Sequence, residues 1–252
     1  MTGARFLNVV VRRPDLRTAF PRRFAARLKG RTLLRLDRRA KYLLAAVSSG
    51  DTLLMHLGMS GSFRVGDPSP PGRHDHVVFH MSSGAAIVFN DPRRFGMMDL
   101  VAAGELRRHP VLSKLGPEPL SDDFDAVTLA RACRGKKTSL KSALLDQRVV
   151  AGLGNIYASE ALHVAGLSPR RPASILATPS GAPRDAARRL VAAIKRVLED
   201  AIARLSKRTY REARFLVYGR SGERCSKSGC TGTIRQRVQS GRSTFYCPVC
   251  QR

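Results

Sequence analysis

Two closely spaced pairs of cysteines near the C-terminus constrain the fold more than any other feature of the sequence. Cys225 and Cys230 are separated by four residues, and Cys247 and Cys250 by two. Such pairs can place four sulfur atoms tetrahedrally around one Zn²⁺ ion, and a segment this small lacks the core to fold without metal. A catalytic zinc ion needs an open coordination position and usually histidine or carboxylate ligands, so four thiolates predict a single structural ion.

The chain also carries a large positive charge. Its 45 lysine and arginine residues against 19 acidic residues give a formal net charge of +26 over 252 residues, and the arginines are spread along the whole length. A compact state with this excess repels itself unless a polyanion is the usual partner, and nucleic acid fits that description best. No segment is long and apolar enough to span a membrane and no signal peptide opens the chain, so we expect a cytoplasmic protein with no membrane partner.

Hydrophobic patterning changes from strands to helices along the chain. Turns around Gly50 and Gly84 separate short β-branched runs, which predicts an antiparallel sandwich or barrel. Farther on, Ser121–Asp123 has the composition of a helix cap, apolar residues recur at helical spacing over 190–205, and Cys133 is expected to be a buried small side chain. The expected strands cover residues 5–11, 32–36, 41–47, 52–57, 76–80 and 86–89.

The stretch Leu144–Glu160 joins two helical patterns through a glycine-rich break. Gly152 and Gly154 permit a tight backbone turn, and Asn155 suits a helix start because its side chain can accept a hydrogen bond from an unpaired amide. A helix start with exposed amides is a ready phosphate site, since the N–H groups and the macrodipole both favour an anion. The alternative is a helical hairpin that has a purely structural role and binds no phosphate. This stretch alone does not decide between a phosphate site and such a hairpin.

Eight segments, in this order along the chain, carry a family resemblance. They are Arg38–Leu44, His56–Ser62, His74–Val77, Asp91–Gly96, Leu115–Leu120, Leu144–Glu160, Val217–Arg220 and Phe245–Cys247. Together they resemble the formamidopyrimidine-DNA glycosylase / endonuclease VIII family of base-excision repair enzymes, most closely its formamidopyrimidine branch.

The resemblance implies an α+β fold in three domains. These are an antiparallel β-sandwich in residues 1–115, a helix–two-turn–helix DNA-binding domain in 116–215, and a four-cysteine zinc-finger β-hairpin in 216–252. The implied activity is that of a DNA glycosylase and AP lyase that acts as a monomer on oxidised bases or abasic sites in duplex DNA.

The resemblance also assigns roles to individual positions. Met59, Arg93 and Phe95 match residues that fill the gap left by a flipped-out nucleotide, whereas on base rates alone Met59 and Phe95 would be core residues. The resemblance implies two catalytic positions, Lys41 and Arg242. Lys41 matches a strand lysine that assists strand cleavage, and Arg242 matches a DNA-contacting arginine of the zinc hairpin that holds a phosphate. The remaining positions implied to contact DNA are His74, Lys136, Lys141 (near the lesion pocket), Asn155 and Tyr218. Without the resemblance, an isolated lysine or arginine would be interpreted as a solvated surface charge.

The amino end departs from the family pattern. The family begins Pro-Glu-Leu-Pro-Glu after the initiator methionine, and the proline amine forms a Schiff base with the sugar while the glutamate handles protons. Here the sequence begins Met1-Thr2-Gly3-Ala4. Either the start is placed downstream of the true one, or the chain binds DNA without catalysis. We expect the former, because a truncated protein would make its uncovered sandwich surface polar and the runs Val9–Val11 and Leu33–Leu34 stay apolar.

Two smaller departures concern the substrate and the metal. The segment 206–217 is shorter than the loop that usually covers a flipped oxidised purine, which puts an 8-oxoguanine preference in doubt. The first cysteine pair is wider than the usual two-residue spacing, though still within zinc-site range. Two rival functions remain open: a non-catalytic protein that binds damaged or abasic DNA, and a general basic zinc-ribbon binder of nucleic acid with no preference for lesions.

Overall fold

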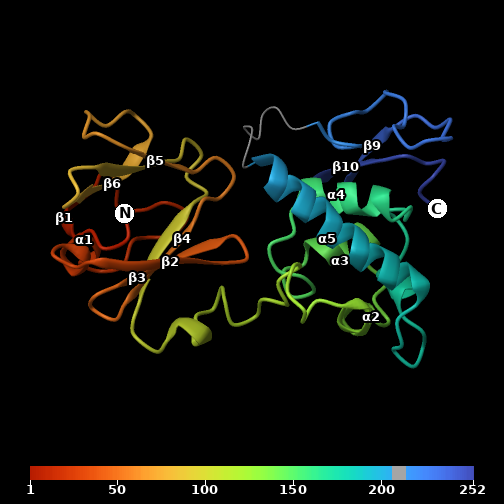
Figure 1. Ribbon diagram of the computed structural model, residues 1–252, viewed down its shortest axis with the longest axis horizontal. Coiled ribbons are helices and arrows are strands. Elements are labelled where there is room, and N and C mark those ends of the chain that lie inside the picture. Colours follow the sequence, from red (N-terminus) through yellow and green to blue (C-terminus); the bar gives the residue numbers. More distant parts are fainter. Residues whose placement is uncertain (206–213) are drawn as a thin grey trace. The chain divides into compact units, whose positions relative to one another are not determined.

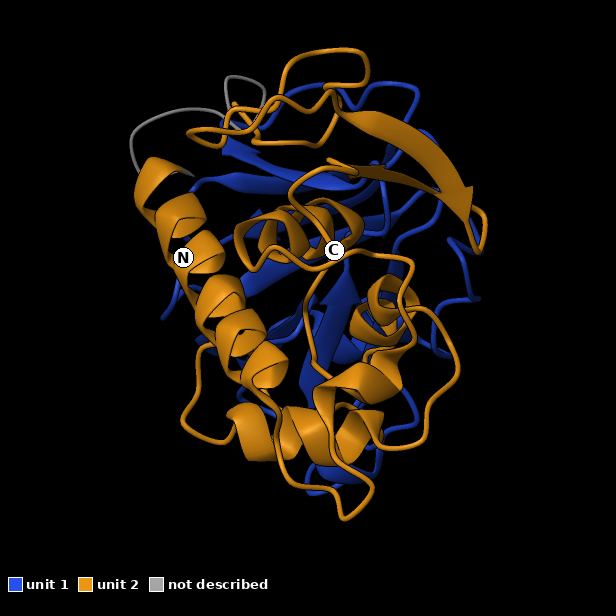
Figure 2. Ribbon diagram, turned by 90° about the vertical axis from the view of Figure 1, so that its right-hand side faces the viewer, with its two compact units in different colours: residues 1–113 blue, residues 114–252 orange. Residues whose placement is uncertain are grey.

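The computed structural model describes residues 1–205 and 214–252, and the chain divides into two compact units. Unit 1 comprises Met1–Ser113 and unit 2 comprises Lys114–Arg252 (Figure 2). The segment 206–217, whose short length bears on the substrate, falls largely on residues outside this description. The predicted boundaries at residues 115 and 215 remain predictions. Across the described part of the chain, no helix combines the length and the apolar character that crossing a bilayer requires.

Unit 1 is an antiparallel β-sandwich, as the sequence predicts. One four-stranded sheet has the order β1-β6-β7-β5 and the other the order β2-β3-β4-β8 (Figure 1). Side chains from both sheets, such as Phe79 and Leu53, share one buried core. The elements are β1 (Phe6–Val11), α1 (Phe24–Leu28), β2 (Leu33–Arg39), β3 (Tyr42–Val47), β4 (Thr52–His56), β5 (Ser62–Gly66), β6 (Asp75–Met81), β7 (Ala86–Asn90), β8 (Met97–Val101) and the 3-10 turn η1 (Leu106–Arg108).

Two of these strands are absent from the sequence prediction. β5 lies at the edge of its sheet and is largely exposed, so its residues lack the apolar run that marks a strand. β8 pairs with β4 at the edge of the other sheet and spans five residues. Strands of five residues place only two or three side chains on each face, which is too few to establish a period-two pattern.

Unit 2 consists of helices with a two-stranded hairpin. A buried cluster that includes Leu129, Leu144, Leu162 and Ile194 fills the space between the helices, and Cys133 is fully buried within it, as predicted. The elements are α2 (Ala126–Cys133), α3 (Leu140–Leu145), α4 (Asn155–Val164), the 3-10 turn η2 (Ala173–Leu176), α5 (Asp185–Leu205), β9 (Arg235–Gln239) and β10 (Arg242–Tyr246). The long helix α5 packs on α4, and α4 also contacts β10 (Figure 1).

Two predicted helix starts need correction. The cap of α2 is Asp125 rather than a residue of Ser121–Asp123, because the Asp125 carboxylate accepts a hydrogen bond from the Thr128 N–H at 2.7 Å. The cap of α4 is Gly154, and the Asn155 side chain does not cap an amide. Its amide nitrogen points to the C-terminal hairpin instead, and in the described part of the chain no N-cap side chain bonds the first amides of α4, which have no intrahelical partner.

Candidate nucleic-acid interface

Two loops of unit 1 present exposed apolar side chains beside a cation. Met59 follows β4 and is 72% exposed, whereas Phe95 precedes β8 and is 42% exposed. The guanidinium carbon of Arg93 lies 4.7 Å from the centroid of the Phe95 ring, which is a cation–π geometry. The structure therefore excludes Met59 and Phe95 from the core and brings Arg93 and Phe95 together. Exposed apolar side chains gathered on loops are typical of a contact surface.

A buried carboxylate fixes the position of these loops. Asp91 is fully buried; its Oδ1 accepts a hydrogen bond from the Ser60 hydroxyl at 2.6 Å, and its Oδ2 accepts one from the Gly96 N–H at 2.8 Å. The Ser60 oxygen also accepts the N–H of Arg93 at 3.2 Å. One side chain thus ties the loop after β4 to the loop before β8. The sequence prediction missed Asp91 as a functional position.

The same two loops approach each other closely at a glycine. A Cβ atom on Gly58 would lie 2.4 Å from the carbonyl carbon of Phe95, and the φ angle of Gly58 is +66°. No other residue fits both the space and the backbone conformation. Met59 is therefore carried on a turn that lies directly against the Phe95 backbone.

Lys41 lies at the turn between β2 and β3, where its side chain is exposed. Burial, followed by the charges of Lys41 and Arg17, lowers the pKa of His56 below its ordinary value. A neutral imidazole can accept a hydrogen bond, and the Nδ1 atom of His56 accepts the Gly58 N–H at 2.9 Å. Lys41 thus acts electrostatically on the residue that holds the turn bearing Met59.

His74 belongs to a strongly basic pocket of unit 1. The pocket has a volume of about 260 Å³ and is lined by Arg13, Arg73, His74, His76, Pro92 and Arg94. Three guanidinium groups around one cavity favour an anion such as a phosphate. The neighbouring His76 is buried, with Nε2 2.9 Å from the carbonyl oxygen of Asp91, which ties the pocket to the two loops described above.

In unit 2, three predicted DNA-contact residues meet around β10. The Asn155 Nδ2 atom donates to the Ser243 carbonyl at 3.0 Å and to the Tyr218 hydroxyl at 3.3 Å. The Lys141 Nζ atom donates to the same carbonyl and to the Thr244 hydroxyl, each at 2.7 Å. One hydrogen-bonded group therefore joins Lys141, Asn155 at the start of α4, Tyr218 and the strand β10.

Lys141 is enclosed rather than exposed in this group. Only 1% of the residue is accessible, and burial followed by the charge of Arg242 lowers the pKa of Lys141 to about 8. Arg242 itself is exposed at the beginning of β10. Lys136 lies in the loop between α2 and α3, and among the described residues no hydrogen bond joins its side chain to the group.

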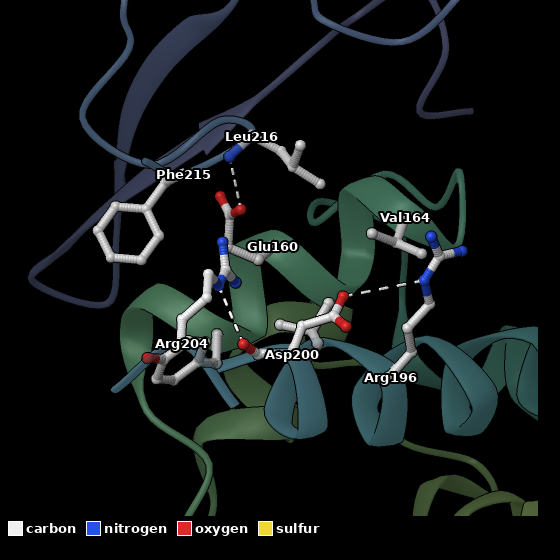
Figure 3. Close-up of a pocket in the computed structure, with 9 residues that line it drawn as sticks. Glu160, Val164, Arg196, Asp200, Arg204, Phe215 and Leu216 are labelled. Carbon is white, nitrogen blue, oxygen red and sulfur yellow. Dashed lines mark hydrogen bonds and ion pairs between the residues drawn. The ribbon is translucent and has the colours of Figure 1, made fainter. Parts of the chain in front are cut away.

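A second buried acid fixes the segment that carries Tyr218. Glu160 is 4% exposed, and its carboxylate accepts the backbone N–H of Leu216 at 2.6 Å (Figure 3). It also accepts the N–H groups of Val217 and Tyr218 at 2.9 Å each. The sequence prediction missed Glu160 as well. Its only local signal is an acid on a helix whose neighbouring positions, such as Ala161 and Leu162, are apolar and buried.

The four cysteines of the C-terminal segment form a candidate metal centre. The sulfur atoms of Cys225, Cys230, Cys247 and Cys250 all lie within 4.8 Å of one another, with 3.8 Å between Cys225 and Cys250 and 3.6 Å between Cys230 and Cys247. A tetrahedral Zn²⁺ site with Zn–S bonds of about 2.3 Å has sulfur–sulfur edges of about 3.8 Å. The donor set and its spacing therefore fit a closed, four-coordinate ion.

Comparison with known proteins gives consistent matches along the chain. The family model of the formamidopyrimidine-DNA glycosylase N-terminal domain matches residues 1–98, and that of the formamidopyrimidine-DNA glycosylase H2TH domain matches residues 115–212. A formamidopyrimidine-DNA glycosylase of Bradyrhizobium sp. is 58% identical over 276 residues, covering 100% of this chain and 94% of its own. One of Azorhizobium caulinodans is 52% identical with the same coverage.

Solved structures match as well. The Lactococcus lactis formamidopyrimidine-DNA glycosylase non-covalently bound to DNA containing an AP site has a TM-score of 0.89 at 30% identity, with 100% of this chain and 94% of that one covered. The MutM (Fpg) protein of Thermus thermophilus has a TM-score of 0.81 at 38% identity, with 100% and 92% covered. The fold expected from the sequence is thereby confirmed.

Proposed function

The chain belongs to the formamidopyrimidine-DNA glycosylase family, and we propose that it is a base-excision repair glycosylase with AP-lyase activity on damaged duplex DNA. The observation that carries this proposal is the exposed pair Met59 and Phe95 on two loops pinned by the buried Asp91. A protein that binds only the DNA backbone has no use for apolar side chains held rigidly at its surface. An enzyme that flips a nucleotide must fill the space that the nucleotide leaves.

Each of the three loop residues has a proposed task. Phe95 wedges between stacked bases, Met59 fills the irregular space beside it, and the Arg93 guanidinium donates hydrogen bonds to the abandoned partner base. Flipping a nucleotide costs a few kcal/mol, so the inserted side chains have a real cost to offset. The contact between Arg93 and the Phe95 ring supports their acting together.

DNA phosphates are proposed to bind at two places. In unit 2, the uncapped amides of α4 with Arg242 and Tyr218 receive one phosphate, while Lys141 and Asn155 hold the Ser243 carbonyl and so shape the site. In unit 1, His74 and the arginines of its pocket receive another. Lys136 is proposed as a further, separate contact.

We propose that the four cysteines hold one Zn²⁺ ion. When bound, the ion supplies no reaction chemistry, because four thiolates leave no open coordination position. The cysteines and the ion together stabilise the hairpin that carries Arg242. Because the relatives reported above are bacterial, we further propose a cytoplasmic protein that works on nucleoid DNA, and by the family resemblance a monomer.

The lyase step needs an amine at the flipped sugar. The family supplies it from an N-terminal proline, whereas here the sequence begins Met1-Thr2, and the Gly3 N–H donates to the Leu33 carbonyl at 2.8 Å beside β2. Lys41 is proposed to assist strand cleavage as a cation, not as the nucleophile.

Borohydride trapping on duplex DNA with an oxidised guanine or an abasic site tests this function. The chain and a version extended by Pro-Glu-Leu-Pro-Glu and the family's first helix are compared. Covalent trapping by either supports the enzyme. Lesion-selective binding with trapping by neither supports the second candidate, a non-catalytic protein for damaged or abasic DNA. Equal affinity for lesion and intact duplex would overturn both and leave a general nucleic-acid binder.

A further inference from the structure

One buried histidine contacts the candidate metal centre without belonging to it. The Nε2 atom of His163 lies 3.3 Å from the sulfur of Cys225, and His163 is only 3% exposed. Among the described residues, the group of side chains close enough to share one ion contains the four cysteines and not His163. The imidazole therefore reaches a ligand atom and not the ion.

The direction of this hydrogen bond follows from the chemistry of the sulfur. A metal-bound thiolate has no proton, so it can only accept, and the Nε2 atom of His163 must carry the hydrogen. The Nδ1 atom is buried, and no described residue offers it a hydrogen bond. With the hydrogen on Nε2, the Nδ1 atom is an acceptor rather than a donor. The opposite tautomer would bury an unpartnered N–H and set two lone pairs against each other, which costs more.

His163 also lies on the helix that contacts the C-terminal hairpin. It is near the C-terminal end of α4, the helix whose first residue, Asn155, holds the Ser243 carbonyl and whose middle carries Glu160. The contact therefore joins the cysteine cluster to the same rigid element that carries the proposed phosphate site.

We propose that His163 is a positioning residue for the metal centre: its Nε2–H donates to the zinc-bound Cys225 thiolate, which slows loss of the ion and anchors the zinc hairpin to α4. A donated hydrogen bond withdraws electron density from the sulfur, and so makes it a poorer target for protonation or for a competing metal-binding agent. Removing such a partner of a metal ligand typically weakens metal binding by about 10–100-fold. The proposal rests on the proposed zinc site and is independent of the glycosylase activity.

The test compares two variants of the zinc-loaded full chain. His163→Phe keeps a planar ring but has no N–H, whereas His163→Gln places an amide N–H at a similar reach. The rate of zinc transfer to a chromogenic chelator is measured without DNA. We expect His163→Phe to release zinc about 10-fold faster or more, and His163→Gln to stay within about 3-fold of the original rate. Unchanged or slower release from His163→Phe, or equally fast release from both variants, would overturn the proposal.

Cobalt substitution adds a readout that packing alone would not move. Loss of the hydrogen bond raises the electron density on sulfur, so the thiolate-to-cobalt charge-transfer band of His163→Phe should shift to lower energy, while that of His163→Gln should not. If His163→Phe fails to fold, ¹⁵N NMR of the histidine-labelled, zinc-loaded protein decides. A proton on Nε2 of His163 supports the proposal, and a proton on Nδ1 alone refutes it. A chain that binds no zinc would instead remove the proposed metal centre and leave the glycosylase proposal standing.

Discussion

Replacing Glu160 with glutamine should destabilise the C-terminal segment far more than a single neutral substitution usually does. The carboxylate lies in the middle of α4, is almost fully buried, and accepts three consecutive backbone N–H groups from Leu216 to Tyr218. Figure 3 shows the first of these bonds, to Leu216. Glu160→Gln preserves the shape of the side chain. It removes the negative charge and turns one of the two acceptor atoms into a donor.

The magnitude follows from the individual bonds. Hydrogen bonds to a charged partner contribute about 1.5–3 kcal/mol and neutral ones about 0.5–1.5 kcal/mol, so the two bonds that an amide oxygen can keep, to Val217 and Tyr218, each weaken by about 1 kcal/mol. The Leu216 N–H would face an amide N–H. Leaving a buried donor unsatisfied costs about 1–3 kcal/mol, less where water can enter, and Leu216 is 39% exposed. We therefore expect the free energy of unfolding of this segment to fall by about 2–4 kcal/mol.

Amide hydrogen exchange of residues 216–218 measures this loss directly. A decrease of about 2–4 kcal/mol corresponds to exchange that is faster by about 30-fold to 1,000-fold, since about 1.4 kcal/mol is a factor of ten. Glu199→Gln is the matched control, because Glu199 is an exposed residue of the neighbouring helix α5 and should change stability by less than about 0.5 kcal/mol. Equal protection of the three amides in Glu160→Gln and in the unaltered chain would refute the reasoning.

Three further outcomes are expected. Phe95→Ala should reduce the preference for lesion over intact duplex by about tenfold while hardly changing affinity for intact DNA, as measured by fluorescence anisotropy; an equal loss of both would argue against a wedge. Burial lowers the pKa of Lys141 from 10.5 to about 8, so between these pH values the unfolded state binds more protons than the folded state. Relative to the Lys141→Met variant, the free energy of unfolding of the chain should therefore increase by about 1–3 kcal/mol from about pH 7.5 to 10.5, as measured by urea titration. Chelating zinc should release Arg242, weaken DNA binding, and reduce the slope of log K against log salt by about 0.9, as Arg242→Ala should also do; full affinity without metal would contradict this.

Features that depend on neighbours in the sequence could be predicted. The hairpins that turn at Gly50 and Gly84 follow from alternating apolar residues around a glycine, and both glycines have positive φ angles, +87° and +86°. The two cysteine pairs follow from their spacing and come together in the structure. The edge strand β5 could not be predicted in this way, because Phe63 and Val65 are its only two large apolar residues and are too few to establish an alternating pattern.

Residues whose partners lie far along the chain could not be predicted. Asn155 and Ser243 are 88 positions apart, and Glu160 and Leu216 are 56 apart. No local pattern indicates which backbone group such a side chain will meet. For the same reason, no local pattern indicates that the ammonium group of Lys141 is buried against β10.

The helix α4 accounts for most of these distant contacts, and this has a physical reason. The C-terminal segment has a small core, in which Val217, Ile234 and Phe245 are the buried residues besides two cysteines. A core of this size cannot by itself fix the segment on the helices, so directional contacts must do so. Asn155, at the start of α4, holds the hairpin, the middle of the helix holds the segment before it, and His163 near the end reaches the sulfur of Cys225. Substitutions at these polar positions should therefore displace the hairpin that carries Arg242 while leaving the helical core, which is apolar and separately packed, intact.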